Sequence, residues 1–84
     1  MKCFVYRSAR RAETYVYLRE QDAFGLLPAA LAEQLGTLSL VLELELGPGR
    51  RLAREDPEVV RGNLAAQGFH LQLPPPEPLS GHAG

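Results

Sequence analysis

The sequence predicts an α+β domain with the element order β-β-α-β-α-β, in which a four-stranded antiparallel or mixed sheet packs against two helices. Two observations support this fold class. Apolar residues alternate with period two near the beginning, the middle and the end of the chain, and two other segments have helical spacing and end at a glycine. The chain has 84 residues, which is enough for one domain with a modest core. We expect both helices to lie mainly on one face of the sheet.

The first two strands are predicted at residues 3–7 and 14–19, where β-branched and aromatic residues occupy both faces of each run. We therefore expect these strands to be central in the sheet and partly covered on both sides. The connection at residues 8–13 contains no Asn-Gly or Gly-Gly pair. This composition predicts a longer loop rather than a two-residue turn.

A short helix is predicted at residues 26–35, because Pro28 suits a first helical position and Gly36 suits the end of a helix. Residues 38–46 then alternate strictly between leucine and other residues, which is typical of a strand. We expect its leucines to face the core together: Leu38, Leu40, Leu42, Leu44 and Leu46. Glu43 and Glu45 then lie on the opposite, solvated face or pair with arginines.

The second helix is predicted at residues 57–67, after a turn at residues 47–49. Asp56 is predicted to cap its beginning, and Pro57 to be its first residue. Gly68 is predicted to end it. The local sequence therefore predicts both ends of this helix.

The last strand is predicted at residues 69–73, with its buried side formed by Phe69, Leu71 and Leu73. His70 is predicted to point away from the core. The proline-rich residues 73–78 favour a polyproline II conformation. They form either an exposed arm that binds a partner or a segment that packs on the domain, and their burial distinguishes the two. We expect the domain to span residues 1–77 and residues 78–84 to form a flexible tail.

A pattern of aromatic, basic and hydroxyl residues opens the chain: Cys3, Tyr6, Arg7, Ser8, Arg10, Thr14, Tyr15, Tyr17 and Leu18. Further blocks follow at residues 26–28, 49–51 and 68–76. Together these segments resemble the bacterial YcgL domain family over nearly the whole chain. The resemblance implies one YcgL-like domain with a sandwich-like α/β fold, as in small proteins of gammaproteobacteria. It implies no activity, because that family has none assigned.

The composition excludes several classes of protein. The formal net charge of −1 argues against a general polyanion-binding domain. A single cysteine excludes a disulfide framework and a four-thiolate zinc site, and no motif indicates a metal or a cofactor. The N-terminal region lacks the long apolar core expected of an export signal, and no apolar run approaches the length of a membrane helix. We therefore expect a cytoplasmic protein without a membrane segment.

The predicted binding surface combines arginines with tyrosines, because guanidinium groups bind phosphates bidentately and phenol rings can stack on unpaired bases. Its residues are Tyr6, Arg7, Arg10, Arg11, Tyr15, Tyr17, Arg50 and Arg51. The three tyrosines are predicted to share one face of the hairpin. The arginines form two groups in sequence: Arg7, Arg10 and Arg11 around the first hairpin, and Arg50, Arg51 and Arg54 after the glycine turn. Whether the two groups converge into one groove, or are instead solvated or paired with glutamates, is left open by the sequence.

The function favoured by these residues is a non-enzymatic binding module for a protein or RNA partner. Replacing Arg10 and Arg11 together is predicted to weaken capture of that partner without unfolding the domain. The alternative is a small enzyme or enzyme accessory with a site at the tyrosine and arginine patch. The enzyme is less favoured because Cys3 and His70 are not expected to form a reactive pair.

Overall fold

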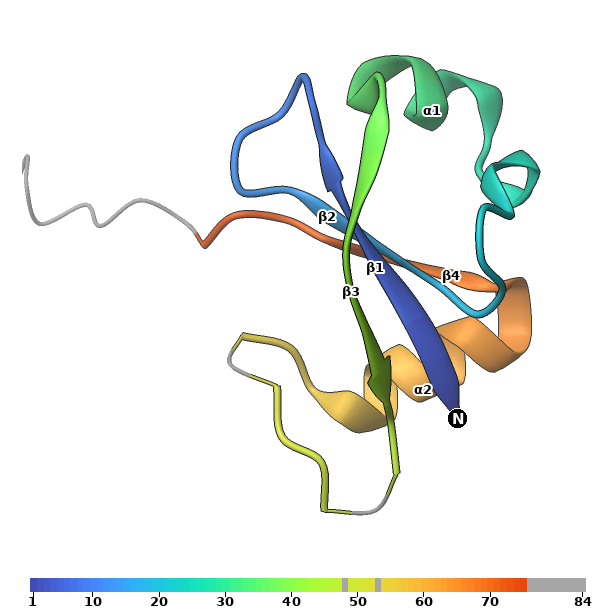
Figure 1. The fold of residues 1–84 in the computed structure, drawn as a ribbon, viewed down its shortest axis with the longest axis vertical. Helices are drawn as coiled ribbons and strands as arrows, with labels where there is room; N and C mark the ends of the chain where they lie inside the picture. Colours follow the sequence, from blue (N-terminus) through green and yellow to red (C-terminus); the bar gives the residue numbers. More distant parts are fainter. Residues whose placement is uncertain (48, 53, 76–84) are drawn as a thin grey trace, which may run out of the picture.

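The computed structural model describes residues 1–47, 49–52 and 54–75 and contains one antiparallel sheet of four strands (Figure 1). In spatial order the strands are β3 (Leu38–Glu45), β1 (Lys2–Ser8), β2 (Tyr15–Leu18) and β4 (Phe69–Gln72). The helical elements are the 3₁₀ turn η1 (Phe24–Leu26), α1 (Ala29–Leu35) and α2 (Pro57–Gln67). The predicted fold class is confirmed, with η1 as an addition to the predicted order.

The central position of β1 and β2 gives the sheet two apolar faces, as the hairpin sequence predicted. The core under α2 consists of Cys3, Val5, Tyr17, Leu46, Val60 and Leu64. The core under α1 consists of Tyr6, Val16, Leu18, Leu27 and Leu35. We call the two sides of the sheet the α2 face and the α1 face.

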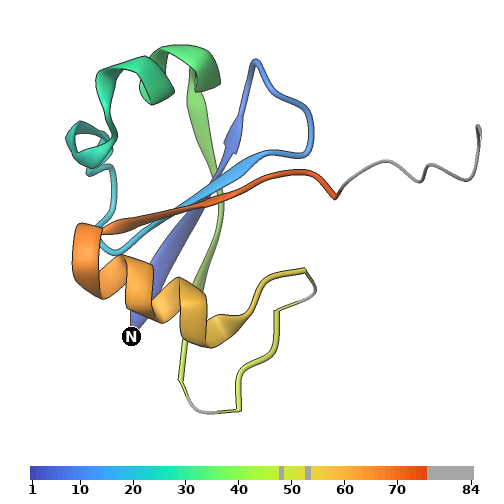
Figure 2. The same ribbon diagram turned by 180° about the vertical axis from the view of Figure 1, so that it is seen from behind.

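Each helix therefore covers its own face, and Figures 1 and 2 show the two helices at separate ends of the sheet. The prediction that both helices lie mainly on one face is wrong. The physical reason lies in β1 and β2, which carry apolar side chains on both sides. Two helices on the same face would leave the apolar side chains of the other face in water.

Strand β3 contains a β-bulge at Val41. Val5 of β1 lies opposite Leu42, whereas the next residue, Tyr6, lies opposite Leu40, so Val41 is an extra residue on β3. The leucines before the bulge consequently face α1 and those after it face α2. The prediction of a single leucine face is wrong. Leu40 and Leu42 are also 43% and 46% exposed, because β3 is an edge strand.

Both helices begin and end close to the predicted residues. Asp56 caps α2, since its Oδ1 accepts a hydrogen bond of 2.9 Å from the backbone N–H of Glu58. Gly68 follows α2 with a φ of +85°, a conformation that glycine adopts without strain. Pro28 precedes α1 as its N-cap rather than its first residue, so that helix begins at Ala29, three residues after the start of the predicted range.

Strand β4 is the second edge of the sheet and is covered on both sides. His70 and Gln72 lie on the α2 face and are only 7% and 9% exposed. Phe69 and Leu71 lie on the α1 face, where they pack against its core. The prediction that His70 points away from the core is wrong, because α2 and the segment before it cover this side of β4. Leu73 is 62% exposed rather than buried.

Pro74 and Pro75 are exposed, like Leu73, so the described part of the proline-rich segment does not pack on the domain. Residues 76–78 of that segment, and the predicted tail at residues 78–84, lie outside the described residues. The same holds for Pro48 in the predicted turn, where the N–H of Arg50 donates to the carbonyl of Gly47 at 3.1 Å.

Candidate functional site

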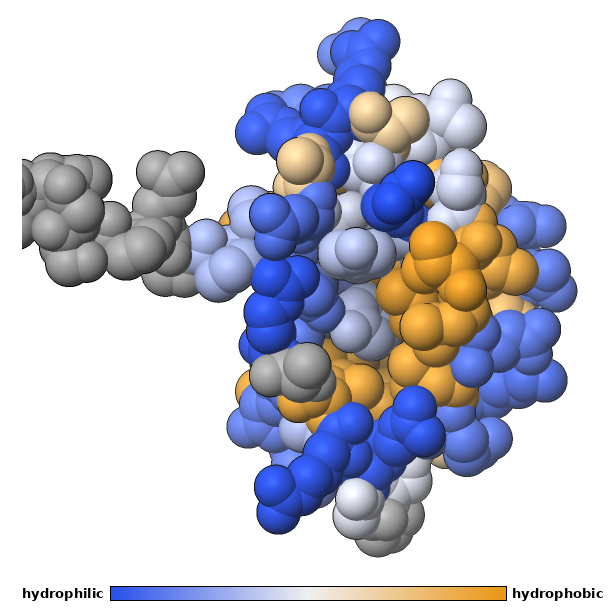
Figure 3. All heavy atoms as spheres, turned by 60° about the vertical axis from the view of Figure 1, so that its left-hand side comes forward, coloured by the Kyte–Doolittle hydropathy of each residue, from blue (hydrophilic) through white to orange (hydrophobic). Residues whose placement is uncertain are grey.

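The α2 face contains a groove beyond the area that α2 covers. Its volume is about 400 Å³. All four strands and the segment between β3 and α2 contribute to its lining: Val5, Arg7, Tyr15, Tyr17, Val41, Leu42, Leu52, Arg54 and Gln72. Figure 3 shows this side of the molecule, where a hydrophobic area lies next to hydrophilic side chains. The groove thus combines apolar contact surface with cations and hydrogen-bonding groups.

The register of the hairpin brings Arg7, Tyr15 and Tyr17 to the groove. Tyr15 lies directly opposite Arg7, and Tyr17 follows two residues later on the same face. The hydroxyl of Tyr17 donates a hydrogen bond of 2.7 Å to Oε1 of Gln72 on β4. Burial, and secondarily the charge of Glu55, raises the pKa of the Tyr17 hydroxyl. Tyr17 is therefore a neutral hydrogen-bond donor at physiological pH.

Arg54 enters the groove from the segment between β3 and α2. Its Nη1 lies 3.5 Å from Oε1 of Glu13, which belongs to the loop between β1 and β2. The Arg54 side chain is 34% exposed and that of Glu13 is 66% exposed. Within the described part of the chain, no carboxylate lies within ion-pair distance of Arg7. One guanidinium of the groove is thus paired and the other faces solvent.

Tyr6 lies on the α1 face, so the prediction that the three tyrosines share one face is wrong. It pairs with Val16 across the hairpin and is buried under α1. Its hydroxyl donates to Oδ1 of Asp22 at 3.0 Å and accepts from the N–H of Asp22 at 2.7 Å. Burial raises the pKa of the Tyr6 hydroxyl. Tyr6 therefore anchors the segment between β2 and α1 and is separated from the groove by the sheet.

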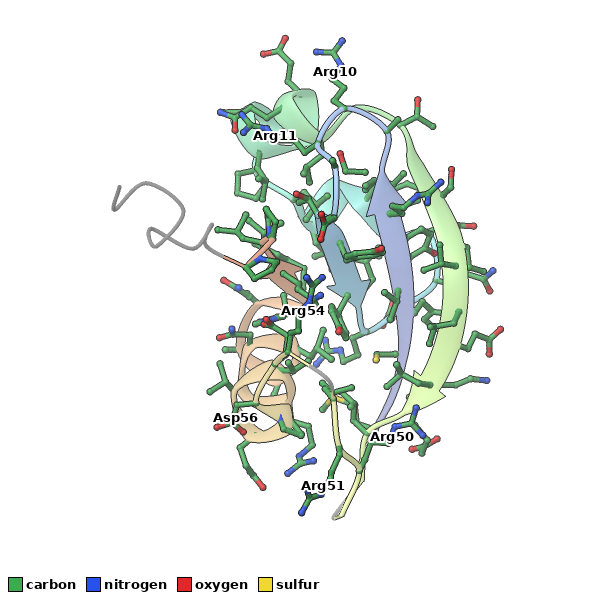
Figure 4. All side chains as sticks on the ribbon, turned by 90° about the vertical axis from the view of Figure 1, so that its left-hand side faces the viewer. Arg10, Arg11, Arg50, Arg51, Arg54 and Asp56 are labelled. Atoms are coloured by element: carbon green, nitrogen blue, oxygen red, sulfur yellow. The ribbon has the colours of Figure 1, made fainter. Side chains whose placement is uncertain are left out.

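Of the two arginine groups named from the sequence, Arg7 of the first and Arg54 of the second line the same groove, whereas the other four arginines lie apart (Figure 4). Figure 4 shows Arg10 and Arg11 at the α1 end, Arg50 and Arg51 at the opposite end, and Arg54 between them. The Arg11 guanidinium donates to the Gln34 side chain at 3.3 Å. The Arg10 side chain lies against the backbone of Gly36, the residue that ends α1. Whether these four arginines contact a partner stays a prediction.

A buried hydrogen-bonded chain next to the groove was not predicted from the sequence. Nε2 of His70 donates to Oε1 of Glu55 at 2.5 Å, and Nδ1 accepts from the side-chain amide of Asn63 at 2.9 Å. The His70 and Glu55 side chains are 8% and 20% exposed. Glu55 is adjacent in sequence to Arg54, so these hydrogen bonds fix the segment that forms one wall of the groove. Only the position of His70 among apolar residues hinted at burial.

Cys3 is fully buried in the core under α2. Burial raises the pKa of its thiol from 9.0 to about 11, which leaves it protonated at neutral pH. Both ring nitrogens of His70 are hydrogen-bonded to other residues, so a reactive pair of Cys3 and His70 is not assembled. Glu43 and Glu45 are paired with Lys2 and the N-terminal ammonium rather than with arginines.

The described residues contain no group of three or more histidine, cysteine, aspartate or glutamate side chains that fits a metal ion. None of the helices in the described ranges is long and apolar enough to span a membrane.

The fold defines a small α+β domain with one helix on each face of an antiparallel sheet. The chain matches the YcgL domain over residues 3–75 and belongs to the YcgL domain family. A YcgL domain-containing protein of Thioalkalivibrio sulfidiphilus is 49% identical over 75 residues, which cover 89% of this chain and 93% of the relative. Another from Stenotrophomonas maltophilia is 45% identical over 75 residues, covering 89% and 87%. A third, from Xanthomonas campestris pv. campestris, is 43% identical over 81 residues, covering 96% and 94%.

Proposed function

We propose that the protein is a non-enzymatic binding module that takes a segment of a protein partner into the groove on the α2 face. The main support is the composition of the groove, in which apolar side chains and two guanidinium groups, Arg7 and Arg54, line one hollow. Apolar surface with a few oriented polar groups is typical of ligand sites. The proposal narrows the predicted arginine and tyrosine surface to the residues that lie together.

The separation of the arginines favours a protein partner over RNA. Nucleic-acid-binding domains gather basic residues along one face or stripe, whereas the labelled arginines of Figure 4 are spread from one end of the molecule to the other. The net charge of −1 agrees with this choice. The alternative of an enzyme lacks a supporting observation, since the Cys3 thiol is buried and His70 is bound on both sides.

The proposal is tested by capturing partners from a bacterial lysate with three forms of the domain: the natural sequence, the double variant Arg7→Gln/Arg54→Gln, and the matched double variant Arg10→Gln/Arg11→Gln. Each capture is run with and without ribonuclease and analysed for protein and RNA. We expect a defined protein to survive ribonuclease and to be lost most strongly with the first double variant. The second variant also tests the sequence-based prediction for the loop arginines.

Two results would contradict the proposal. Recovery of RNA that falls steeply with salt, with protein lost after ribonuclease, identifies a nucleic-acid-binding surface. An equal or larger loss with Arg10→Gln/Arg11→Gln places the interface at the α1 end instead of the groove. Circular dichroism and thermal unfolding of each variant ensure that only folded proteins are compared.

A further inference from the structure

We infer that the groove selects an acidic segment of the partner, whose carboxylate displaces Glu13 from Arg54. This inference rests on the proposed function and names the chemistry of the segment that the groove accepts. The starting point is an ion pair within the domain, in which the carboxylate of Glu13 contacts Arg54, one of the two arginines of the groove.

The pair of Glu13 and Arg54 joins two loops that are 41 residues apart in sequence. At 3.5 Å, and with the Glu13 side chain 66% exposed, it is a solvated ion pair of the kind that stabilises a fold weakly. Glu13 has a φ of +55°, which is uncommon for a residue other than glycine. Because the pair is exposed and weak, an external carboxylate in the groove replaces Glu13 at Arg54 at little cost.

The surroundings of the pair supply the rest of the recognition. The groove adjoins a second hollow of about 490 Å³, and the two share Arg7 and Tyr15. Glu13 lines the second hollow, whereas none of the described residues that line the groove itself carries a carboxylate. A carboxylate that enters the groove therefore meets Arg54 and the unpaired Arg7, and guanidinium groups bind carboxylates in bidentate geometry.

Apolar residues of the partner that flank its acidic residue can contact the apolar part of the groove. Val41 and Leu42 form its wall on β3, and Leu52 lies on the segment after β3. Val41 and Leu42 are 45% and 46% exposed, and contact with apolar groups of a ligand would remove part of this surface from water. The preferred segment is therefore an acidic residue flanked by apolar residues in an extended conformation.

The inference is tested with the blocked tripeptide acetyl-leucyl-glutamyl-leucinamide as the probe, titrated into the full chain and followed by ¹⁵N NMR spectra that include the arginine Nε–H signals. We expect saturable shifts at Tyr15, Gln72 and Arg54, with a dissociation constant in the millimolar range. The glutaminyl counterpart of the peptide should bind more weakly. Glu13→Gln should tighten binding about two- to five-fold, because it removes the internal competitor.

Glu33→Gln is the matched control. It removes the same charge from an exposed position on α1, away from the groove, and should leave the affinity close to that of the natural sequence. The inference is overturned if Glu13→Gln binds the peptide no more tightly than Glu33→Gln, or if no saturable shift appears up to the solubility limit. Shifts that gather around Arg10 and Arg11, or around Arg50 and Arg51, overturn it as well.

The two proposals fail separately. If capture from lysate depends on Arg7 and Arg54 but the tripeptide does not compete with Glu13, the groove binds a protein partner of different chemistry. If the tripeptide binds as expected but capture does not depend on these arginines, the acidic preference stands and the proposed function is wrong.

Discussion

Tyr17 belongs at once to the core under α2, to the groove and to the surroundings of His70. Its ring packs edge-on against that of His70, with the ring centroids 5.6 Å apart. Its hydroxyl donates a hydrogen bond to the buried side-chain oxygen of Gln72. The side chain is therefore fixed by packing and by hydrogen bonding, which positions the groove floor before any ligand binds.

The buried thiol of Cys3 should make the free energy of unfolding decrease as the pH rises above 9. The unfolded chain releases the thiol proton at its ordinary pKa of 9.0, whereas burial holds the pKa in the folded domain at about 11. The stabilising contribution is fully present below pH 9 and is lost as the pH rises through 11, by at most about 1.4 kcal/mol per pH unit. Tyr6 and Tyr17, whose pKa values are also raised by burial, act in the same direction.

The measurement is urea unfolding of the natural sequence and of Cys3→Ala at about pH 8 and about pH 10. Both proteins share the tyrosine contribution, so the difference between them reports the thiol. We expect the natural sequence to lose more unfolding free energy over this interval than Cys3→Ala. Equal losses would show that the thiol ionises at its ordinary pKa in the folded domain.

At the scale of elements, the segment between β3 and α2 is the part of the groove that lacks regular secondary structure. It supplies Leu52 and Arg54, and it is attached to β4 through Glu55 and His70. The attachment is buried and charge-assisted, in contrast to the exposed pair of Arg54 with Glu13. One wall of the groove is thus held at Glu55 by a buried hydrogen bond, whereas the ion pair of Arg54 next to it is exposed to solvent.

Glu55→Gln should loosen this wall. The substitution keeps the size of the side chain but removes the charge from its hydrogen bond with His70, which should lower the free energy of unfolding by about 1–3 kcal/mol. Capture through the groove should weaken as well, because Arg54 is adjacent to the released residue. Urea unfolding gives the stability and the capture experiment gives the binding.

Glu33→Gln again provides a control of equal charge and size, since Glu33 is exposed on α1. It should change the unfolding free energy by less than about 0.5 kcal/mol. If Glu55→Gln is as stable as this control, the negative charge of Glu55 adds nothing to the strength of its hydrogen bond with His70 or to the stability of the fold.

At the scale of the whole molecule, the two cores share β1 and β2, so they should unfold together. Val16 of the core under α1 and Val60 of the core under α2 are both fully buried. We expect Val16→Ala and Val60→Ala each to lower the free energy of unfolding by about 2 kcal/mol. Each variant should unfold in a single transition at a lower urea concentration, with an unchanged m-value.

Far-ultraviolet circular dichroism and tyrosine fluorescence follow the two variants during the same titrations. Coincident transitions with both probes identify one cooperative unit. A variant that releases only its own helix, so that the two probes separate, would show that the faces unfold independently.

The sequence predicted those parts of the fold that depend on neighbouring residues. Asp56 and Gly68 set the ends of α2 through their own backbone and side-chain preferences, and these ends were correct. The face of Tyr6 was wrong because it depends on the register across a loop, which residues near Tyr6 do not encode. His70 was placed wrongly because its partners, Glu55 and Asn63, come from other elements.

The candidate site was predictable to a similar degree. Alternation placed Tyr15 and Tyr17 on one face, and Arg7 on the same side of β1 as Val5. Arg54 was grouped with Arg50 and Arg51 by sequence proximity, whereas the structure separates it from them and places it in the groove with Arg7. The groove itself depends on where α2 ends over the sheet, which is a tertiary property.

The bulge at Val41 also affects how copies of this protein behave in concentrated solution. An edge strand with exposed leucine and valine side chains is a template on which further strands of other molecules assemble. On β3 the extra residue at Val41 reverses which side chains point to which face of the sheet. A regular strand from another molecule can therefore match the side-chain pattern on one half of β3 but not on the other half. The feature that turns Leu42 toward the groove thereby also protects the apolar edge against aggregation.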